Sequence, residues 1–428
     1  MGPMTMNVAQ VKAGLLDRSI FSAADVYERE LEQIFARCWL FVAHESQLPN
    51  PNDFVTSYMG EDPVLVWRDA AGKVHAFLNM CRHRGNRLCR ADAGNAASFM
   101  CTYHGWTFAS DGRLEAVPGF TEVYGGELDL RKWGLVEVAQ LAVYKGLIFA
   151  TFDPSAPPLA DYIGAQRPLL DFMLDRRAGG TELLGGVHKW VMRTNWKYPV
   201  DNFGGDDGHH LITHASVRKV PVDAIDYGAN VVDQYNKNTH AREVAFDLSA
   251  DERQRVEDAL ARTPAGVLRD YAREHFPEAL RRLGREAYRE SIVESVFPNL
   301  SLNSGRHMLR VWHPRGPGAT EMWSYCIVDR DAPAAVKDAL RLHMTQTFGP
   351  AGNFEQDDIN NWQQCTETAA GWVARRYPQN IQAGLTDRPD AEIGRKLGVR
   401  LRGLYTRWAV LMEGRPWSAI DLASPDWT

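Results

Sequence analysis

The sequence reads CRHRG at residues 81–85 and CTYHGW at residues 101–106. Each segment places one cysteine and one histidine on a short loop at the end of a run of β-forming residues, so two loops can meet around one metal centre. Two thiolates and two imidazoles suit either a tetrahedral zinc ion or a [2Fe–2S] cluster of the Rieske type. Zinc fingers usually pair cysteine with cysteine and histidine with histidine, so the mixed pairing favours the Rieske cluster. The candidate ligands are Cys81, His83, Cys101 and His104.

The composition excludes several classes of protein. The 428 residues predict two or three domains, and 45% hydrophobic with 24% charged residues argues against a disordered or fibrous chain. A net charge of −6 is unfavourable for nucleic-acid binding, which needs clustered basic residues. The arginines at residues 82–90 are instead expected to offset the charge of the cluster or to form a docking face. Because we find no signal peptide and no apolar run of membrane-spanning length, we expect a cytoplasmic protein with neither a nucleic acid nor a membrane as its partner.

A second group of ligand-type side chains lies at residues 201–214, which read DNFGGDDGHHLITH. Two histidines and one carboxylate form the facial triad of many non-haem Fe(II) sites, which leaves open positions for O₂ and substrate. The stretch FEQDDINNW at residues 354–362 supplies carboxylates on another predicted helix. Simple helix geometry favours His210 with His214, four residues apart on one face. His209 and His214 are about 140° apart on a regular helix, so that pair needs a distorted or π-type turn.

The remaining pattern predicts a mixed α and β chain. A helix is expected at residues 22–40 with Ser22 as its cap. Short β-rich runs with hairpin turns at 71–72 and 111–112 predict a small all-β domain. Later segments predict strands at 296–302, 308–313 and 321–328, and helices at 333–348, 354–368 and 391–412.

On these motifs the chain resembles the large (alpha) subunit of Rieske non-haem iron aromatic-ring-hydroxylating dioxygenases, of the naphthalene and biphenyl dioxygenase type. The likeness covers nearly the whole chain. It implies an α+β fold in which a small all-β Rieske domain is inserted into a larger antiparallel-sheet catalytic domain with helices, of the helix-grip type. The implied domains are an N-terminal helix within residues 1–40 that packs on the catalytic domain, the Rieske [2Fe–2S] domain at 41–155, and the mononuclear-iron domain at 156–428.

The resemblance also implies a role for each site residue. The family's ligands to the mononuclear Fe(II) fall on His209, His214 and Asp358, which selects His209 over His210. Asp206 falls on the carboxylate that links a cluster to the iron of the neighbouring subunit. Asn202 falls on the asparagine near the iron.

The activity that the resemblance implies is that of a terminal oxygenase. It would use O₂ and electrons from NADH to cis-dihydroxylate an aromatic ring, in an aromatic hydrocarbon or an aromatic acid. The chain has no dinucleotide-binding or P-loop motif, so the electrons would come from a separate reductase, directly or through a ferredoxin. A small β subunit and an α₃ or α₃β₃ assembly are implied as well.

Other functions remain open from the residues alone. A Rieske monooxygenase, such as a salicylate-type hydroxylase or a demethylase, would share both iron sites. An electron-transfer module or a structural zinc protein would account for the first motif only. Arg306 and His307 could bind a substrate carboxylate.

Overall fold

The computed structural model describes residues 8–205, 209–215, 254, 256–257, 260, 263–289, 293–383, 385, 392–420 and 422. The chain divides into two compact units. One unit comprises Met1–Ile34 and Ala160–Thr428, and the other comprises Phe35–Leu159. The smaller unit is therefore inserted into the chain of the larger one, and the predicted α+β class is confirmed.

The smaller unit is built from three antiparallel sheets. Their strand orders are β5-β4-β3-β6, β7-β8-β9 and β10-β11-β2. The large aromatic side chains Trp67, Phe77 and Phe108 form the buried centre of this unit. The strands are β2 (Leu40–His44), β3 (Asp53–Met59), β4 (Asp62–Arg68), β5 (Val74–Leu78), β6 (Ala93–Asn95), β7 (Ser98–Met100), β8 (Thr107–Ala109), β9 (Leu114–Ala116), β10 (Gln140–Tyr144) and β11 (Leu147–Thr151).

The predicted hairpins of this unit form, and one further hairpin appears. The turns at 71–72 and 111–112 connect β4 to β5 and β8 to β9. The apolar stretch from residue 141 to 152, which looks like one long run, is the hairpin β10–β11. Both turn residues have a positive φ, Lys145 at 47° and Gly146 at 92°. Gly146 was the available signal, but lysine is not the usual residue before it in such a turn.

The larger unit contains a six-stranded antiparallel sheet in the order β12-β17-β16-β15-β14, and β13 also pairs with β17. The predicted strand at 296–302 is two strands with a turn between them at 297–299. Pro298 lies in that turn, and a proline cannot donate to the ladder. The strands are β12 (Thr181–Leu183), β13 (His188–Met192), β14 (Val293–Val296), β15 (Leu300–Asn303), β16 (Met308–Pro314) and β17 (Thr320–Asp329). A separate short pair joins β1 (Leu15–Leu16) to β18 (Gln379–Asn380).

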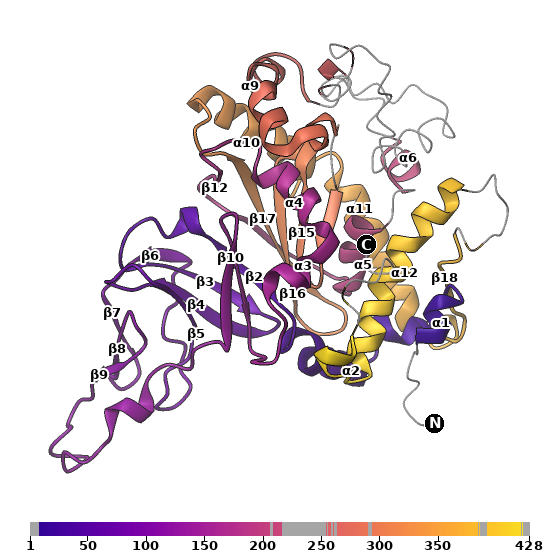
Figure 1. The fold of residues 1–428 in the computed structure, drawn as a ribbon. Helices are drawn as coiled ribbons and strands as arrows, with labels where there is room; N and C mark the ends of the chain where they lie inside the picture. Colours follow the sequence, from indigo (N-terminus) through magenta and orange to yellow (C-terminus); the bar gives the residue numbers. More distant parts are fainter. Residues whose placement is uncertain are drawn as a thin grey trace. The chain divides into compact units, whose positions relative to one another are not determined.

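Helices pack on this sheet and on one another. Helix α5 contacts β14 and β15, α10 contacts β17, and α9 lies beside α10, as Figure 1 shows. The helices are α1 (Val8–Lys12), α2 (Ala24–Glu30), α3 (Leu159–Ile163), α4 (Arg167–Leu174), α5 (Lys197–Gly204), α6 (His210–Thr213), α9 (Val267–Leu283), α10 (Ala334–Phe348), α11 (Glu355–Ala370) and α12 (Glu392–Met412). Among the described residues, no helix is both long and apolar enough to cross a membrane.

The predicted helix at 22–40 is shorter than expected. It comprises α2 and a π-helical turn at Leu31–Phe35, and β2 follows at Leu40. The prediction that Ser22 caps it was wrong, because Ala23 is the N-cap residue. The Ser22 hydroxyl instead donates to the carbonyl of Ala369, 3.1 Å away. A tertiary hydrogen bond has replaced the local one.

A fully buried carboxylate ties α2 to the rest of the larger unit. Lys197 Nζ lies 2.6 Å from Glu30 Oε1, and neither side chain is exposed to solvent. The indole N–H groups of Trp196 and Trp408 donate to the same carboxylate at 2.8 and 2.7 Å. Burial lowers the pKa of Lys197, and the Glu30 carboxylate acts in the opposite direction. Glu30 thus holds α2, the start of α5 and α12 together.

We expect Lys197→Met to lower the free energy of unfolding by about 3–5 kcal/mol, because it leaves a buried carboxylate without its cation. The double variant Glu30→Gln/Lys197→Met should lose less than the two single variants combined, because no buried charge remains. Lys337→Met is a control that breaks the partly exposed pair with Glu182 and should cost below about 1 kcal/mol. Urea denaturation followed by circular dichroism measures all four variants, and strictly additive losses would contradict the pairing.

Candidate metal centres

Two turns of matching geometry carry the predicted cluster residues. The Cys81 N–H donates to the carbonyl of Asn86 at 2.8 Å, and the Gly85 N–H returns to the Cys81 carbonyl at 2.9 Å. In the second turn, Cys101 and Gly105 make the same two bonds at 2.7 and 2.9 Å, with Trp106 in the place of Asn86. Each turn therefore presents a cysteine and, two or three residues later, a histidine on the same tight loop.

The two thiols are buried and lie next to each other in these turns. Cys81 and Cys101 are about 1% and 2% exposed, and neither forms a disulfide. Burial raises the pKa of Cys81, and the neighbouring Cys101 adds to this effect. Burial also raises the pKa of Cys101, but the Tyr103 backbone N–H and the Asn86 side chain outweigh it, so the net pKa of Cys101 is lowered. The lowered pKa makes the thiolate of Cys101, the form that a metal requires, easier to reach than in an ordinary thiol.

The two imidazole rings lie next to each other. The His83 ring stacks on Trp106 with 4.9 Å between ring centroids, and the His104 ring lies 4.5 Å from His83. His83 Nδ1 is buried and has no hydrogen-bond partner among the described residues. Burial, and then the proximity of His104, lowers the pKa of His83. Because the lowered pKa favours the neutral ring, His83 fits a metal ligand.

The pairing of the four side chains fits a two-iron cluster. The Cys81 and Cys101 thiols are neighbours, and the His83 and His104 rings lie 4.5 Å apart. The two thiolates can therefore hold one iron and the two imidazoles the other, as in a Rieske cluster.

Gly105→Ala should reduce the amount of cluster more than Gly85→Ala does. Both glycines have positive φ, 75° and 74°, so both variants carry the same backbone strain, about 1–2 kcal/mol. A Cβ at Gly105 would lie 2.7 Å from Cγ of Pro118, whereas a Cβ at Gly85 would meet nothing within 4 Å. Visible absorbance per protein and an iron count compare the variants. Equal cluster content in both would show that the Pro118 contact does not matter.

The larger unit brings together the residues of the second predicted site. His209 Nε2 and His214 Nε2 lie 3.6 and 3.4 Å from the same oxygen, Asp358 Oδ1. That oxygen is buried and accepts no hydrogen bond from the part of the chain that the structure describes. Three ligand atoms therefore converge on one point without bonding one another, which is the arrangement that a single Fe(II) ion satisfies.

The iron ligands lie on two elements, the short helix α6 and the first turn of α11. The two histidines flank α6, which is a single helical turn in which the Thr213 N–H donates to the His209 carbonyl at 2.8 Å. His214 lies just beyond the end of α6, so the two histidines meet across a single short turn and not along a regular helix, in keeping with the predicted distorted or π-type turn. Asp358 lies in the first turn of α11, where three acidic residues face the positive end of the helix dipole.

Burial and the neighbouring charges together set the pKa of Asp358. Burial raises the pKa of Asp358 to about 7, against the lowering effect of His209. Glu355, one turn earlier on α11, adds to the increase. Glu355 forms a fully buried ion pair with Arg310, whose guanidinium also lies 5.1 Å from the Phe203 ring. This pair anchors the start of α11 to β16 beside the ligand.

Several residues around the triad were not predicted from the sequence. Asp357 Oδ2 lies 3.6 Å from His214 Nδ1, and the Phe354 ring lies 4.9 Å from the His214 ring. Both orient the imidazole, as outer-shell partners of metal ligands commonly do. Both residues lie within four positions of Asp358 in the FEQDD stretch, and this closeness in the sequence was the feature that could have identified them.

The other predicted site residues have different outcomes. Asn202 Nδ2 lies 3.4 Å from His209 Nε2, so the amide is beside the point of convergence. Asp206 and the side chain of His210 lie outside the described residues. Arg306 is buried and bonds His343 at 2.9 Å, and burial with this arginine lowers the pKa of His343 to about 3.

In protein prepared without the mononuclear iron, the Asp358 carboxyl should stay protonated until the pH rises through about 7. The raised pKa follows from burial, so the acid form persists well above its ordinary range. Infrared difference spectra against Asp358→Asn should show a carboxylic-acid band that disappears near that pH, and also when Fe(II) is added. A band that titrates near the ordinary value of 3.8 would contradict the burial argument.

Comparisons with known proteins agree with this geometry. Residues 38–137 match the family described as the Rieske [2Fe-2S] domain, and residues 181–391 match the ring hydroxylating alpha subunit (catalytic domain). The alpha subunit of biphenyl 2,3-dioxygenase from Rhodococcus jostii is 38% identical over 97% of this chain and 92% of its own. The alpha subunit of benzene 1,2-dioxygenase from Pseudomonas putida is 36% identical over 95% of this chain and 93% of its own.

A solved structure supports the same assignment. Naphthalene 1,2-dioxygenase with indole bound aligns with a TM-score of 0.83 and 30% identity, covering 99% of this chain and 97% of that one. The fold and the two sites define a Rieske-type oxygenase. This chain belongs to the alpha subunits of the aromatic-ring-hydroxylating dioxygenases. It is thus an oxidoreductase that carries a Rieske [2Fe–2S] cluster and a mononuclear iron.

Proposed function

We propose that this chain is the terminal oxygenase component that uses O₂ to cis-dihydroxylate the ring of an aromatic hydrocarbon. The observation that carries the proposal is the convergence of two histidines and Asp358 in a chain that also has the paired Cys and His turns. Relatives named for biphenyl, chlorobenzene and benzene, 36–38% identical, support a hydrocarbon ring as substrate. When bound and reduced, the iron supplies the activation of O₂.

We propose the following roles for the site residues. Cys81, His83, Cys101 and His104 hold the cluster, and His209, His214 and Asp358 hold the iron. Two histidines and one carboxylate would leave positions of the iron free for O₂ and substrate. The Asn202 amide lies next to His209 Nε2 and is placed to donate a hydrogen bond to a group bound there. Asp206 would pass electrons between the cluster of one subunit and the iron of the next.

The chain's own residues would control water and protons at this site. Asp358 and His214 are almost fully buried, at 2% and 5% exposure, which limits access of water to the iron ligands. Phe354 and Asp357 hold the His214 ring in one orientation. With Asp358 buried, iron uptake displaces its proton, and the resulting carboxylate balances one positive charge of the metal.

The family works with electron-transfer partners, and we propose the finer arrangement. Electrons would come from NADH through a separate reductase, with or without a ferredoxin. The assembly would be α₃ or α₃β₃ with a small β subunit, in the cytoplasm. Residues 41–155 would form the cluster domain, and 156–428 with 1–40 the iron domain, which the compact units Phe35–Leu159 and Met1–Ile34 with Ala160–Thr428 support.

Product analysis tests the reaction against a monooxygenase. With ¹⁸O₂, a reconstituted electron supply and biphenyl, naphthalene or benzene, the product should be a cis-dihydrodiol in which both oxygens carry the label. A phenol with one labelled oxygen as the first product, and no diol, would overturn the dihydroxylation and favour the monooxygenase.

Paired histidine variants test the ligand assignment. His209→Ala should lose the mononuclear iron and turnover while it keeps the visible and EPR spectra of the cluster, because the cluster residues lie in the other unit. His210→Ala is the matched control and should keep the iron. The opposite result, with iron lost only in His210→Ala, would show that simple helix geometry identified the ligand correctly.

A further inference from the structure

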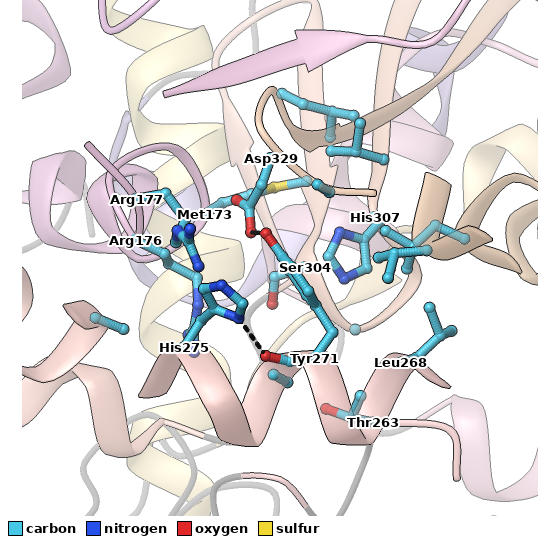
Figure 2. A pocket seen from close by; sticks show the side chains of 18 of the residues that line it. Met173, Arg176, Arg177, Thr263, Leu268, Tyr271, His275, Ser304, His307 and Asp329 are labelled. Carbon is cyan, nitrogen blue, oxygen red and sulfur yellow. Dashed lines mark hydrogen bonds between the residues drawn. The ribbon is translucent and has the colours of Figure 1, made fainter. Parts of the chain in front are cut away.

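A cavity of about 100 Å³ lies in the larger unit, away from the residues of the iron site. It is bounded by α9, by the segment that follows α4, and by the turn before β16 and the end of β17. None of the three proposed iron ligands lines it. Figure 2 shows Arg176 and Arg177 on one side of the cavity and His307 on the other, with Tyr271 between them. A cavity with this many polar groups needs an explanation that the oxygenase chemistry does not give.

The cation of Arg176 is the unusual feature of this cavity. Among the described residues, Arg176 makes no hydrogen bond and no ion pair, and its guanidinium lies 4.9 Å from the Phe172 ring. The other arginines of the wall are neutralised, because Arg177 lies 3.0 Å from Glu278 and Arg289 lies 2.5 Å from Glu286. Burial lowers the pKa of Arg176, and the charge of Asp329 acts in the opposite direction. An anion in the cavity would relieve the cost of this burial.

The acidic group of the cavity is shared among several cations. Burial raises the pKa of Asp329, and His307, Arg176 and Arg177 act in the opposite direction. Its Oδ2 also accepts a hydrogen bond from the Tyr271 hydroxyl at 3.3 Å. His275 Nδ1 is bonded to the Tyr271 carbonyl at 2.9 Å, as the dashed line between them in Figure 2 shows. Asp329 attracts Arg176 without an ion-pair contact among the described residues, so the guanidinium keeps N–H donors for a ligand.

One part of the wall is apolar. It is formed by Phe172, Met173, Leu268, Ile327, Val336 and Leu340. Such a wall favours a ligand with a hydrocarbon body over a multiply charged, fully hydrated anion. A cavity of about 150 Å³ accepts benzene, so about 100 Å³ admits roughly four to six non-hydrogen atoms.

We propose that this cavity is a second ligand site, which binds a short-chain monocarboxylate with its carboxylate on Arg176 and its hydrocarbon chain against the apolar wall. The proposal does not depend on the function proposed above. Arginine suits this ligand because its planar fork matches both oxygens of a carboxylate.

Propionate binding to the purified holoprotein tests the site. Ligand-observed NMR with propionate should show saturable binding, and propionamide, which has the same size without the charge, should bind at least about tenfold more weakly. Arg176→Gln should weaken propionate binding by a similar factor. Arg341→Gln, which changes an exposed arginine paired with Asp338 on α10, should bind propionate as the wild type does.

A second variant locates the ligand independently of Arg176. Ala272→Leu adds bulk to a residue of the cavity wall and should abolish propionate binding, with folding checked by circular dichroism. The proposal is overturned if the wild type shows no saturable binding, if propionamide binds equally well, or if both Arg176→Gln and Ala272→Leu keep wild-type affinity. Inorganic phosphate that competes as strongly as propionate would show a general anion site and would also overturn the assignment to a carboxylate.

Discussion

The arrangement of the larger unit depends on the buried carboxylate of Glu30. It joins α2, near the start of the chain, to Lys197 at the start of α5 and to Trp408 near the end of α12. Helix α5 carries Asn202, whose amide lies 3.4 Å from His209 Nε2, so this ion pair fixes a helix that borders the iron site. A second buried pair, Arg310 with Glu355, fixes the start of α11 at the same site. Both pairs lie in low dielectric, where a charge without its partner costs several kcal/mol.

The two metal centres differ in how far apart their ligands lie in the sequence. The cluster turns are local, because each cysteine and histidine pair lies within four residues and is closed by its own backbone hydrogen bonds. The iron site needs α6 and α11 to meet, although His214 and Asp358 are far apart in the sequence. Local turns can form early and independently, whereas the iron site exists only when the helices of the larger unit have packed. The iron ligands should therefore be the more sensitive of the two to distant changes in packing.

This difference explains what the sequence could predict. The cluster residues, the hairpin turns and most strands of the sheet follow from local patterns, and α10 to α12 begin and end within a few residues of their expected positions. The choice of His209 over His210 needed the family resemblance, because the helix between the histidines is too short for simple helical spacing to apply. The partners of Glu30 and Arg310 lie 167 and 45 residues away, so no local sequence pattern could predict them. The tertiary hydrogen bond of Ser22, which replaces the expected cap, could not be predicted for the same reason. Asp357 and Phe354 were visible in the quoted stretch, but only the packed structure shows that both contact His214.

The central claim is that one chain holds two different iron centres. The most direct test is the iron and zinc content of the anaerobically purified protein, together with EPR spectra before and after reduction with dithionite. About three irons per chain, no zinc and a reduced signal of low average g are expected for one [2Fe–2S] cluster and one mononuclear Fe(II). A colourless protein that contains zinc, or a brown protein with two irons that takes up no third, would contradict the account.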